Sequence, residues 1–148
     1  MAKRYIPDVA EQNALNEANY LRLEKLLGDC EAPRYEFYWT SPSGSEVEVF
    51  IEVMERFKFT TTLNISKVNP EMPPPMREVA LTLRLYHDAR MAEVVTWTQG
   101  KQLSGVYRYP NDRMYQIDEK AQANVYLSEW LAHLLRHGIT RHAWVPSL

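Results

Sequence analysis

The segment from residue 79 to residue 97, VALTLRLYHDARMAEVVTW, constrains the fold of this chain more than any other stretch. Apolar and polar side chains alternate along much of both halves, which is typical of β-strands with one buried face. Residues 87–90 separate the halves and suit a turn, so we expect a hairpin. Pairing of Tyr86 with Met91 would then place Arg84 opposite Glu93.

The two faces of this predicted hairpin differ in chemistry. Strand alternation puts every second side chain on the same face, so the register decides which residues are buried. The apolar face belongs to the core and carries Leu81, Leu83, Leu85 and Val94. The polar face carries Arg84, Tyr86 and Glu93.

The two-residue period recurs elsewhere in the chain. It predicts strands in residues 35–39, 47–53 and 59–65, and a last strand in 103–109. Short turns join the first three strands, so neighbours should pair antiparallel. A proline-rich loop, residues 69–77, interrupts the series, with four of the nine prolines in 69–75. We expect a stiff crossover loop there, with a flap or docking strap as the alternative.

Helical spacing replaces the strand pattern at both ends of the chain. Residues 8–28 predict a helix that ends at Gly28, and residues 116–137 predict one that stops at Gly138. Its apolar face should carry Ile117, Ala121, Val125, Leu131, Leu134 and Leu135. We therefore expect one α+β domain: an antiparallel meander of about six strands in residues 34–109, flanked by an N-terminal and a C-terminal helix. Residues 1–7 would form an arm and 138–148 a tail.

Composition excludes several classes of function. The chain has 148 residues, 45% of them hydrophobic, and a net charge of -2. Its basic residues are dispersed, so we expect no nucleic-acid partner. No apolar run approaches the roughly 20 residues that cross a bilayer, so we expect no membrane association. Cys30 is the only cysteine, which fits a reducing compartment and predicts a cytoplasmic location.

The polar face of the hairpin is the leading candidate site. It predicts a ligand-binding group of Arg84, Tyr86, His87, Asp88 and Glu93, joined by Asp118 of the last helix. If the last helix covers this face, the planar donors of Arg84 would suit a small anionic ligand. If the face is open to solvent, Arg84 and Glu93 would form an ordinary surface pair, and Asp88 would serve the turn.

Three histidines gather near the C-terminus, namely His133, His137 and His142. His133 and His137 are four residues apart on a helix, and Glu129 lies one turn earlier on the same face, a spacing that can bring ligands to one metal. A metalloprotease helix carries glutamate directly after its first histidine, whereas this chain has Leu134 there. We therefore expect surface histidines, no functional metal site and no cofactor.

Several short motifs together resemble a known family. They are KRYIPD at residues 3–8, TLRLYHDA at 82–89, MAEV at 91–94, YPN at 109–111, DEK at 118–120, and the pairs at 130–131 and 137–138. This combination, spread over nearly the whole chain, is similar to the YqiB-like family of gammaproteobacterial proteins, a domain of unknown function. The resemblance implies a small cytoplasmic protein and carries over no catalytic residues. The shared site would lie among Arg84, Tyr86, His87, Asp88, Glu93, Asn111, Asp118 and Lys120.

Three kinds of function remain open on the sequence. The pattern favours a non-enzymatic binding or regulatory module, with a small anionic ligand or a protein as its partner. The alternative is a small enzyme that acts on nucleotides or phosphoesters, which would require His87, Asp88, Glu93 and Asp118 to converge on one reacting atom. The third is a structural protein that associates as a homodimer.

Overall fold

The computed structural model of the protein describes residues 9–28, 31–74, 76–99, 102–103 and 113–143. Only the backbone is described for residues 99, 102–103, 113–119 and 141–143. The predicted arm 1–7, Cys30, Asn111 and most of the predicted strand 103–109 lie outside the described residues.

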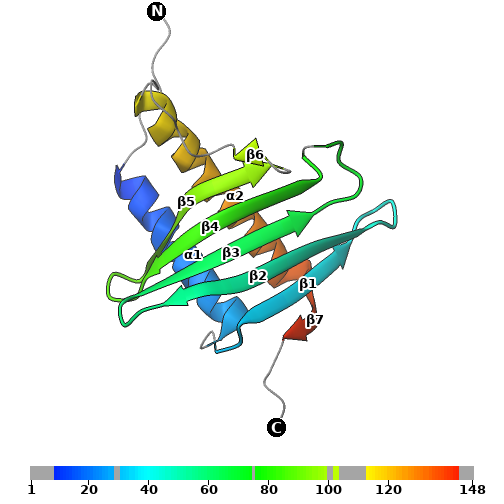
Figure 1. Cartoon of the computed structure of the whole chain (residues 1–148), viewed down its shortest axis with the longest axis horizontal. Coiled ribbons are helices and arrows are strands. Elements are labelled where there is room, and N and C mark those ends of the chain that lie inside the picture. The colour runs from blue at the N-terminus through cyan, green and yellow to red at the C-terminus, as the bar shows by residue number, and fades with distance from the viewer. Residues whose placement is uncertain (1–8, 29–30, 75, 100–101, 104–112, 144–148) are drawn as a thin grey trace, which may run out of the picture.

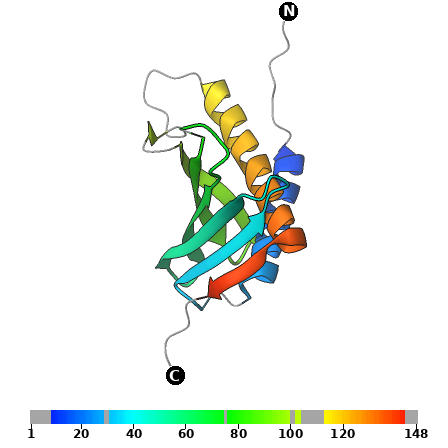
Figure 2. The same cartoon turned by 90° about the vertical axis from the view of Figure 1, so that its right-hand side faces the viewer.

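The described strands form one antiparallel sheet with the order β6-β5-β4-β3-β2-β1-β7 (Figure 1). Both helices lie on one face of this sheet, as Figure 2 shows, and no helix of the described residues lies on the other face. The elements are α1 (Val9–Leu27), β1 (Arg34–Thr40), β2 (Glu46–Arg56), β3 (Thr60–Val68), β4 (Glu78–Tyr86), β5 (Met91–Gln99), β6 (Gln102–Leu103), α2 (Arg113–His137) and β7 (Ile139–Ala143).

The predicted α+β class is confirmed, and β1 to β6 follow one another through the sheet as a meander. A seventh strand, β7, pairs with β1 at the other edge, although its residues were expected to form a tail. Residues 139–143, ITRHA, lack the apolar alternation by which the longer strands were recognised. The strand forms because Gly138 ends α2 beside the unpaired edge of β1, where the backbone groups of β7 find partners.

The register of the central hairpin is the one predicted from its sequence. Tyr86 pairs with Met91, and Arg84 pairs with Glu93. Leu83 and Val94 face the helices and are fully buried. Alternation along the neighbouring strands continues this apolar layer, whose buried members include Phe37, Val49, Ile51, Leu63, Ile65 and Leu81. The core therefore lies between one face of the sheet and the two helices.

The apolar face expected for α2 needs a correction. Val125 and Leu135 were assigned to the core, but they are 46% and 41% exposed. The buried positions include Asn124, which is 2% exposed, and Trp130. A search for apolar spacing does not select an asparagine, so the predicted face was rotated by about one residue at this turn.

Asn124 is buried where it links three elements. Its side-chain Oδ1 accepts a hydrogen bond from the backbone N–H of Val94 in β5 at 2.8 Å. Its backbone carbonyl accepts from Asn19 Nδ2 of α1 at 3.2 Å, and Arg22 donates to Asn19 Oδ1 at 2.9 Å. In the described residues β6 pairs with β5 only at Thr98 and Gln99. The side chain of Asn124 thus satisfies a strand N–H that points away from β4.

We predict that Asn124→Ala lowers the free energy of unfolding by about 2–3 kcal/mol, because it leaves the Val94 N–H buried without an acceptor. Denaturant unfolding followed by circular dichroism measures the change. The adjacent variant Val125→Ala, at an exposed position of the same helix, should stay within about 0.5 kcal/mol of the wild type. Equal stability of the two variants would show that the amide network does not hold α2 to the sheet.

Candidate functional site

The polar residues predicted on the hairpin lie on the face of the sheet that the helices leave open. Arg84 is exposed there, so α2 does not cover it. Tyr86 Oη donates to Glu93 Oε1 at 2.8 Å, and Lys120 Nζ of α2 lies 3.3 Å from Glu93 Oε2. Burial and this hydrogen bond to Glu93 raise the pKa of the Tyr86 phenol. The structure brings Tyr86 and Glu93 together, while the side chain of Asp118 lies outside the described part.

His87 lies on the opposite face, where it joins α1 to the sheet. Its Nδ1 lies 2.8 Å from Tyr20 Oη and its Nε2 lies 2.7 Å from Thr61 Oγ1. Both ring nitrogens therefore have protein partners. Asp88 is exposed, and its carboxylate accepts the N–H of Ala89 at 3.0 Å, a turn interaction. The enzyme hypothesis requires His87 and Glu93 to converge on one reacting atom. They lie on opposite faces of the sheet and therefore do not.

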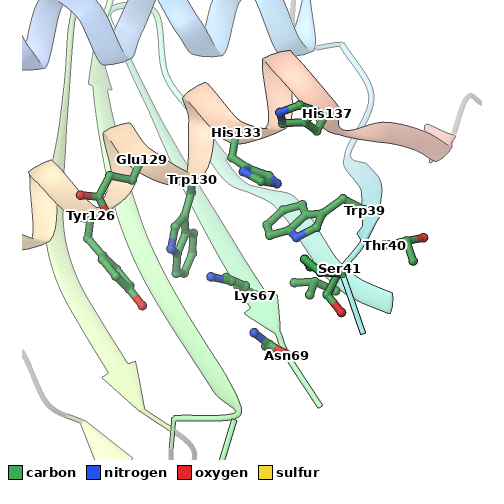
Figure 3. A pocket seen from close by; sticks show the side chains of 12 residues that line it. Trp39, Thr40, Ser41, Lys67, Asn69, Tyr126, Glu129, Trp130, His133 and His137 are labelled. Carbon is green, nitrogen blue, oxygen red and sulfur yellow. The ribbon is translucent and has the colours of Figure 1, made fainter. Parts of the chain in front are cut away.

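A cleft of about 650 Å³ opens elsewhere, between the C-terminal half of α2 and the ends of β1, β2 and β3 (Figure 3). Its size is typical of small-molecule sites. We call it the α2 cleft. The described residues that line it are Trp39, Thr40, Ser41, Pro42, Val47, Lys67, Asn69, Tyr126, Glu129, Trp130, His133 and His137.

Side chains at helical spacing in α2 and at strand spacing in β3 form walls of the α2 cleft. Positions 126, 129, 130, 133 and 137 follow the three-and-four spacing of one helix face, so α2 presents them as a single stripe. In β3, Thr61, Leu63 and Ile65 point toward the helices, and Lys67 is the next residue on that face. Lys67 pairs with Val49 on one side and Val79 on the other, both of them buried.

The ammonium group of Lys67 lies among aromatic rings. Its Nζ is 5.6 Å from the ring centre of Trp39 and 5.5 Å from that of Trp130, within the range of cation–π attraction. Burial lowers the pKa of Lys67, and the nearby Glu129 carboxylate partly opposes this effect. No hydrogen bond or ion pair within 4.0 Å joins this ammonium to another residue in the described part of the chain.

His133 packs beside this lysine on the helix wall. Its ring centre is 4.3 Å from that of Trp39 and 5.1 Å from that of His137. Burial lowers the pKa of His133 below 6.5, and the positive charges of His137, Lys67 and Arg136 lower it further. At pH 7 the imidazole is therefore neutral, with one donor and one acceptor nitrogen.

The indole of Trp130 adds an unused donor to the same wall. Trp130 is 3% exposed, and its Nε1 is buried without a hydrogen-bond partner among the described residues. A buried N–H that lacks an acceptor costs about 1–3 kcal/mol. Figure 3 shows this nitrogen on the side of the ring toward Tyr126, whose side chain is at the surface.

Among the described side chains, no group of three His, Cys, Asp or Glu residues is arranged to hold a metal ion. Glu129, His133 and His137 share one face of α2, as the spacing predicted. The role of the two histidines in the structure is to form one end of the α2 cleft.

Sequence reasoning named the α2 histidines but missed the cleft that they line. The missed signal is Lys67, because the alternation in β3 was followed only to Ile65. One further step of two residues would have placed a charged side chain on the core face. The aromatic walls were not recognisable, since their members come from β1 and from the middle of α2.

Fold and site define a class of protein: a one-layer antiparallel sheet, covered on one face by two helices, with an aromatic cleft under the second helix. Neither helix, over its described residues, has the length and apolar character that a bilayer span needs. The family described as "Protein of unknown function (DUF1249)" matches residues 22–140. The chain belongs to this family.

Curated relatives of this chain are named as uncharacterised proteins. The protein is 35% identical over 136 residues to "Uncharacterized protein YqiB" of Escherichia coli (strain K12), covering 92% of this chain and 94% of the relative. The identity and coverage are the same for "Uncharacterized protein YqiB" of Escherichia coli O157:H7. These findings confirm the family resemblance seen in the motifs. No solved structure matches the chain.

We predict that the His133 imidazole titrates below pH 6.5 in NMR spectra, because the folded protein disfavours its charged form. Its pKa should rise in His137→Gln and in Lys67→Met, with the larger rise in His137→Gln, since each variant removes one neighbouring positive charge. Stability should fall as pH decreases through 6.5, where unfolded His133 takes up a proton before the folded form does. A midpoint at or above 6.5 in the wild type would contradict the described surroundings of His133.

Proposed function

We propose that the protein is a cytoplasmic binding module that takes up a small anionic ligand in the α2 cleft. The observation that carries this proposal is the Lys67 ammonium, which lies inside the cleft without a hydrogen bond or ion pair to another described residue. The presence of a single cysteine supports the cytoplasmic location.

Lys67 lies in the row of β3 side chains that point toward the helices, and this position supports a ligand-binding role. An aliphatic residue there would extend the apolar layer of Leu63 and Ile65, whereas a lysine loses hydration. The lowered pKa of Lys67 reflects this loss. Residues that reduce stability in this way are common where function requires them.

Neighbouring groups suit an anion that approaches Lys67. Asn69 brings a side-chain amide to the rim, and its N–H groups can donate hydrogen bonds, while the Ser41 hydroxyl there donates to Glu71 Oε1 at 2.9 Å. Indole rings on two sides shield the ammonium from part of the solvent, which strengthens its attraction for an anion. The same rings restrict the site to ligands that fit beside aromatic surfaces.

Arg84, the residue for which the sequence predicts an anion site, remains a second proposal. It is exposed on the open sheet face, and its cross-strand neighbour is the acidic Glu93. Tyr86, Asp88 and Asp118 belong to the same proposal, whereas the predicted member His87 faces α1 and contacts Tyr20 and Thr61 instead. The α2 cleft is favoured over it because the cleft is concave and shields its charged group from solvent.

The test is a titration of the purified protein with sulfate, phosphate, acetate, benzoate and phenyl phosphate, followed by tryptophan fluorescence and calorimetry. We expect saturable binding of at least one of these anions, and at least a tenfold loss of affinity in Lys67→Met. Lys58→Met is the matched control, because Lys58 Nζ also lies beside an aromatic ring, 5.2 Å from the centre of Phe59. Lys58 does not line the cleft, so its loss should leave binding unchanged.

Two results would contradict the proposal. One is the absence of saturable binding by every anion in the series. The other is equal loss of affinity in Lys67→Met and Lys58→Met, which would indicate general charge attraction instead of a site. Lys67→Met should keep the wild-type fold, since methionine fills a similar volume among apolar neighbours.

A further inference from the structure

We infer that the natural occupant of the α2 cleft is an aromatic monocarboxylate, a flat ring that carries a single carboxylate group. This inference rests on the proposed function, because it specifies which class of anion the cleft would select. Three features of the described residues support it: the charge of the cleft, its ring-lined walls and the unused N–H of Trp130.

The charge of the cleft suits an anion with one negative charge. Lys67 is the only lysine or arginine among the described lining residues, and Glu129 is the only carboxylate. His133 adds no charge at pH 7, since its pKa is lowered below 6.5. A dianionic phosphate beside Lys67 and Glu129 would leave two uncompensated negative charges in the cleft, whereas a monocarboxylate would leave one.

The walls of the cleft suit a flat ring. Trp39 and His133 come from β1 and α2 and lie with their ring centres 4.3 Å apart. Tyr126 and Trp130 lie with ring centres 5.3 Å apart on the helix side, tilted by 56°. Trp39 and Trp130 flank Lys67, and Tyr126 lies on the far side of Trp130 (Figure 3). An aromatic ligand gains both burial and ring–ring contacts there, which a small inorganic anion does not.

The buried N–H of Trp130 supplies the second hydrogen bond that a carboxylate needs. A carboxylate has two oxygens that only accept hydrogen bonds, and in the proposed complex the oxygen that does not face Lys67 accepts from the indole N–H after Tyr126 has rotated aside. The N–H is closed off from solvent and has no described protein acceptor. Rotation of the exposed Tyr126 side chain, which lies on that side of the indole, would open a path to it.

The experiment compares benzoate with matched probes on the wild-type protein by calorimetry. Acetate keeps the carboxylate without the ring, benzamide keeps the ring without the charge, and phenyl phosphate keeps the ring with a larger charge. We expect benzoate to bind at least tenfold more tightly than each of the three. In ¹H–¹⁵N spectra the indole N–H of Trp130 should shift downfield on addition of benzoate, and that of Trp97 should not.

A pair of tryptophan variants tests the hydrogen bond. Trp130→Phe keeps a ring and removes the N–H, so it should weaken benzoate binding at least fivefold. Trp97→Phe is the control, since Trp97 packs against the core and does not line the cleft. If Trp130→Phe fails to fold, the shift of the wild-type Trp130 N–H decides the point without a variant.

The outcomes separate this inference from the proposed function. Tighter binding of phenyl phosphate than of benzoate, abolished by Lys67→Met, would overturn the inference and leave the proposed anion site intact. Benzoate binding that does not shift the Trp130 N–H would also overturn the inference. Failure of every anion, or binding that is insensitive to Lys67→Met, would overturn both.

Discussion

The alternation of side chains along the strands, with both helices on one face, is the constraint from which the rest of this structure follows. Each residue that points toward α1 and α2 must fit the layer between sheet and helices, whatever its chemistry. Along β3 this layer receives Thr61, Leu63 and Ile65, and then Lys67. Lys67 therefore continues the row of helix-facing side chains of β3 at the point where this row reaches the second half of α2. The cleft forms around this charged residue.

The position of α2 across the sheet is set at two places. Near its middle, Asn124 accepts the Val94 N–H of β5 and binds α1 through Asn19. Toward its C-terminus, His133 packs against Trp39 of β1. Between these points the helix crosses the strands that lie between β5 and β1 (Figure 1). The cleft wall is thus held by a buried polar network at one end and an aromatic contact at the other.

The hydrogen bonds of this network fix the position of α2 relative to the sheet, which apolar contacts alone would leave variable. Leucines on α2 can slide by a fraction of a turn with little loss, whereas the hydrogen bond from Val94 to Asn124 is satisfied in one arrangement. His87 serves the same purpose for α1, where it contacts Tyr20 of the helix and Thr61 of β3. Rigid placement of this kind favours a preformed site, since little order must be created when a ligand binds.

Local pattern was sufficient to predict the strands β1 to β5 and the faces of the hairpin from the sequence. The pairing of Tyr86 with Met91 followed from the turn, and the burial of Leu83 followed from the pairing. Features that depend on contacts between distant segments were not predictable in this way. Asn124 looks like a surface residue until Val94 is beside it, and β7 has too little apolar alternation to be recognised alone. The cleft belongs to the same group, because the Trp39 and Trp130 rings meet Lys67 only in three dimensions.

The most direct test of the central claim is an NMR titration of the lysine side chains, observed at Cε and Nζ. The account predicts that the Lys67 signals are shifted upfield by the two indole rings and that Lys67 loses its proton at a pH below 10.5. Lys25, which is exposed in the last turn of α1, serves as the internal reference for the chemical shifts. If Lys67 shows the shifts and titration of a free lysine, its side chain does not enter the layer under α2, and the proposed site is wrong.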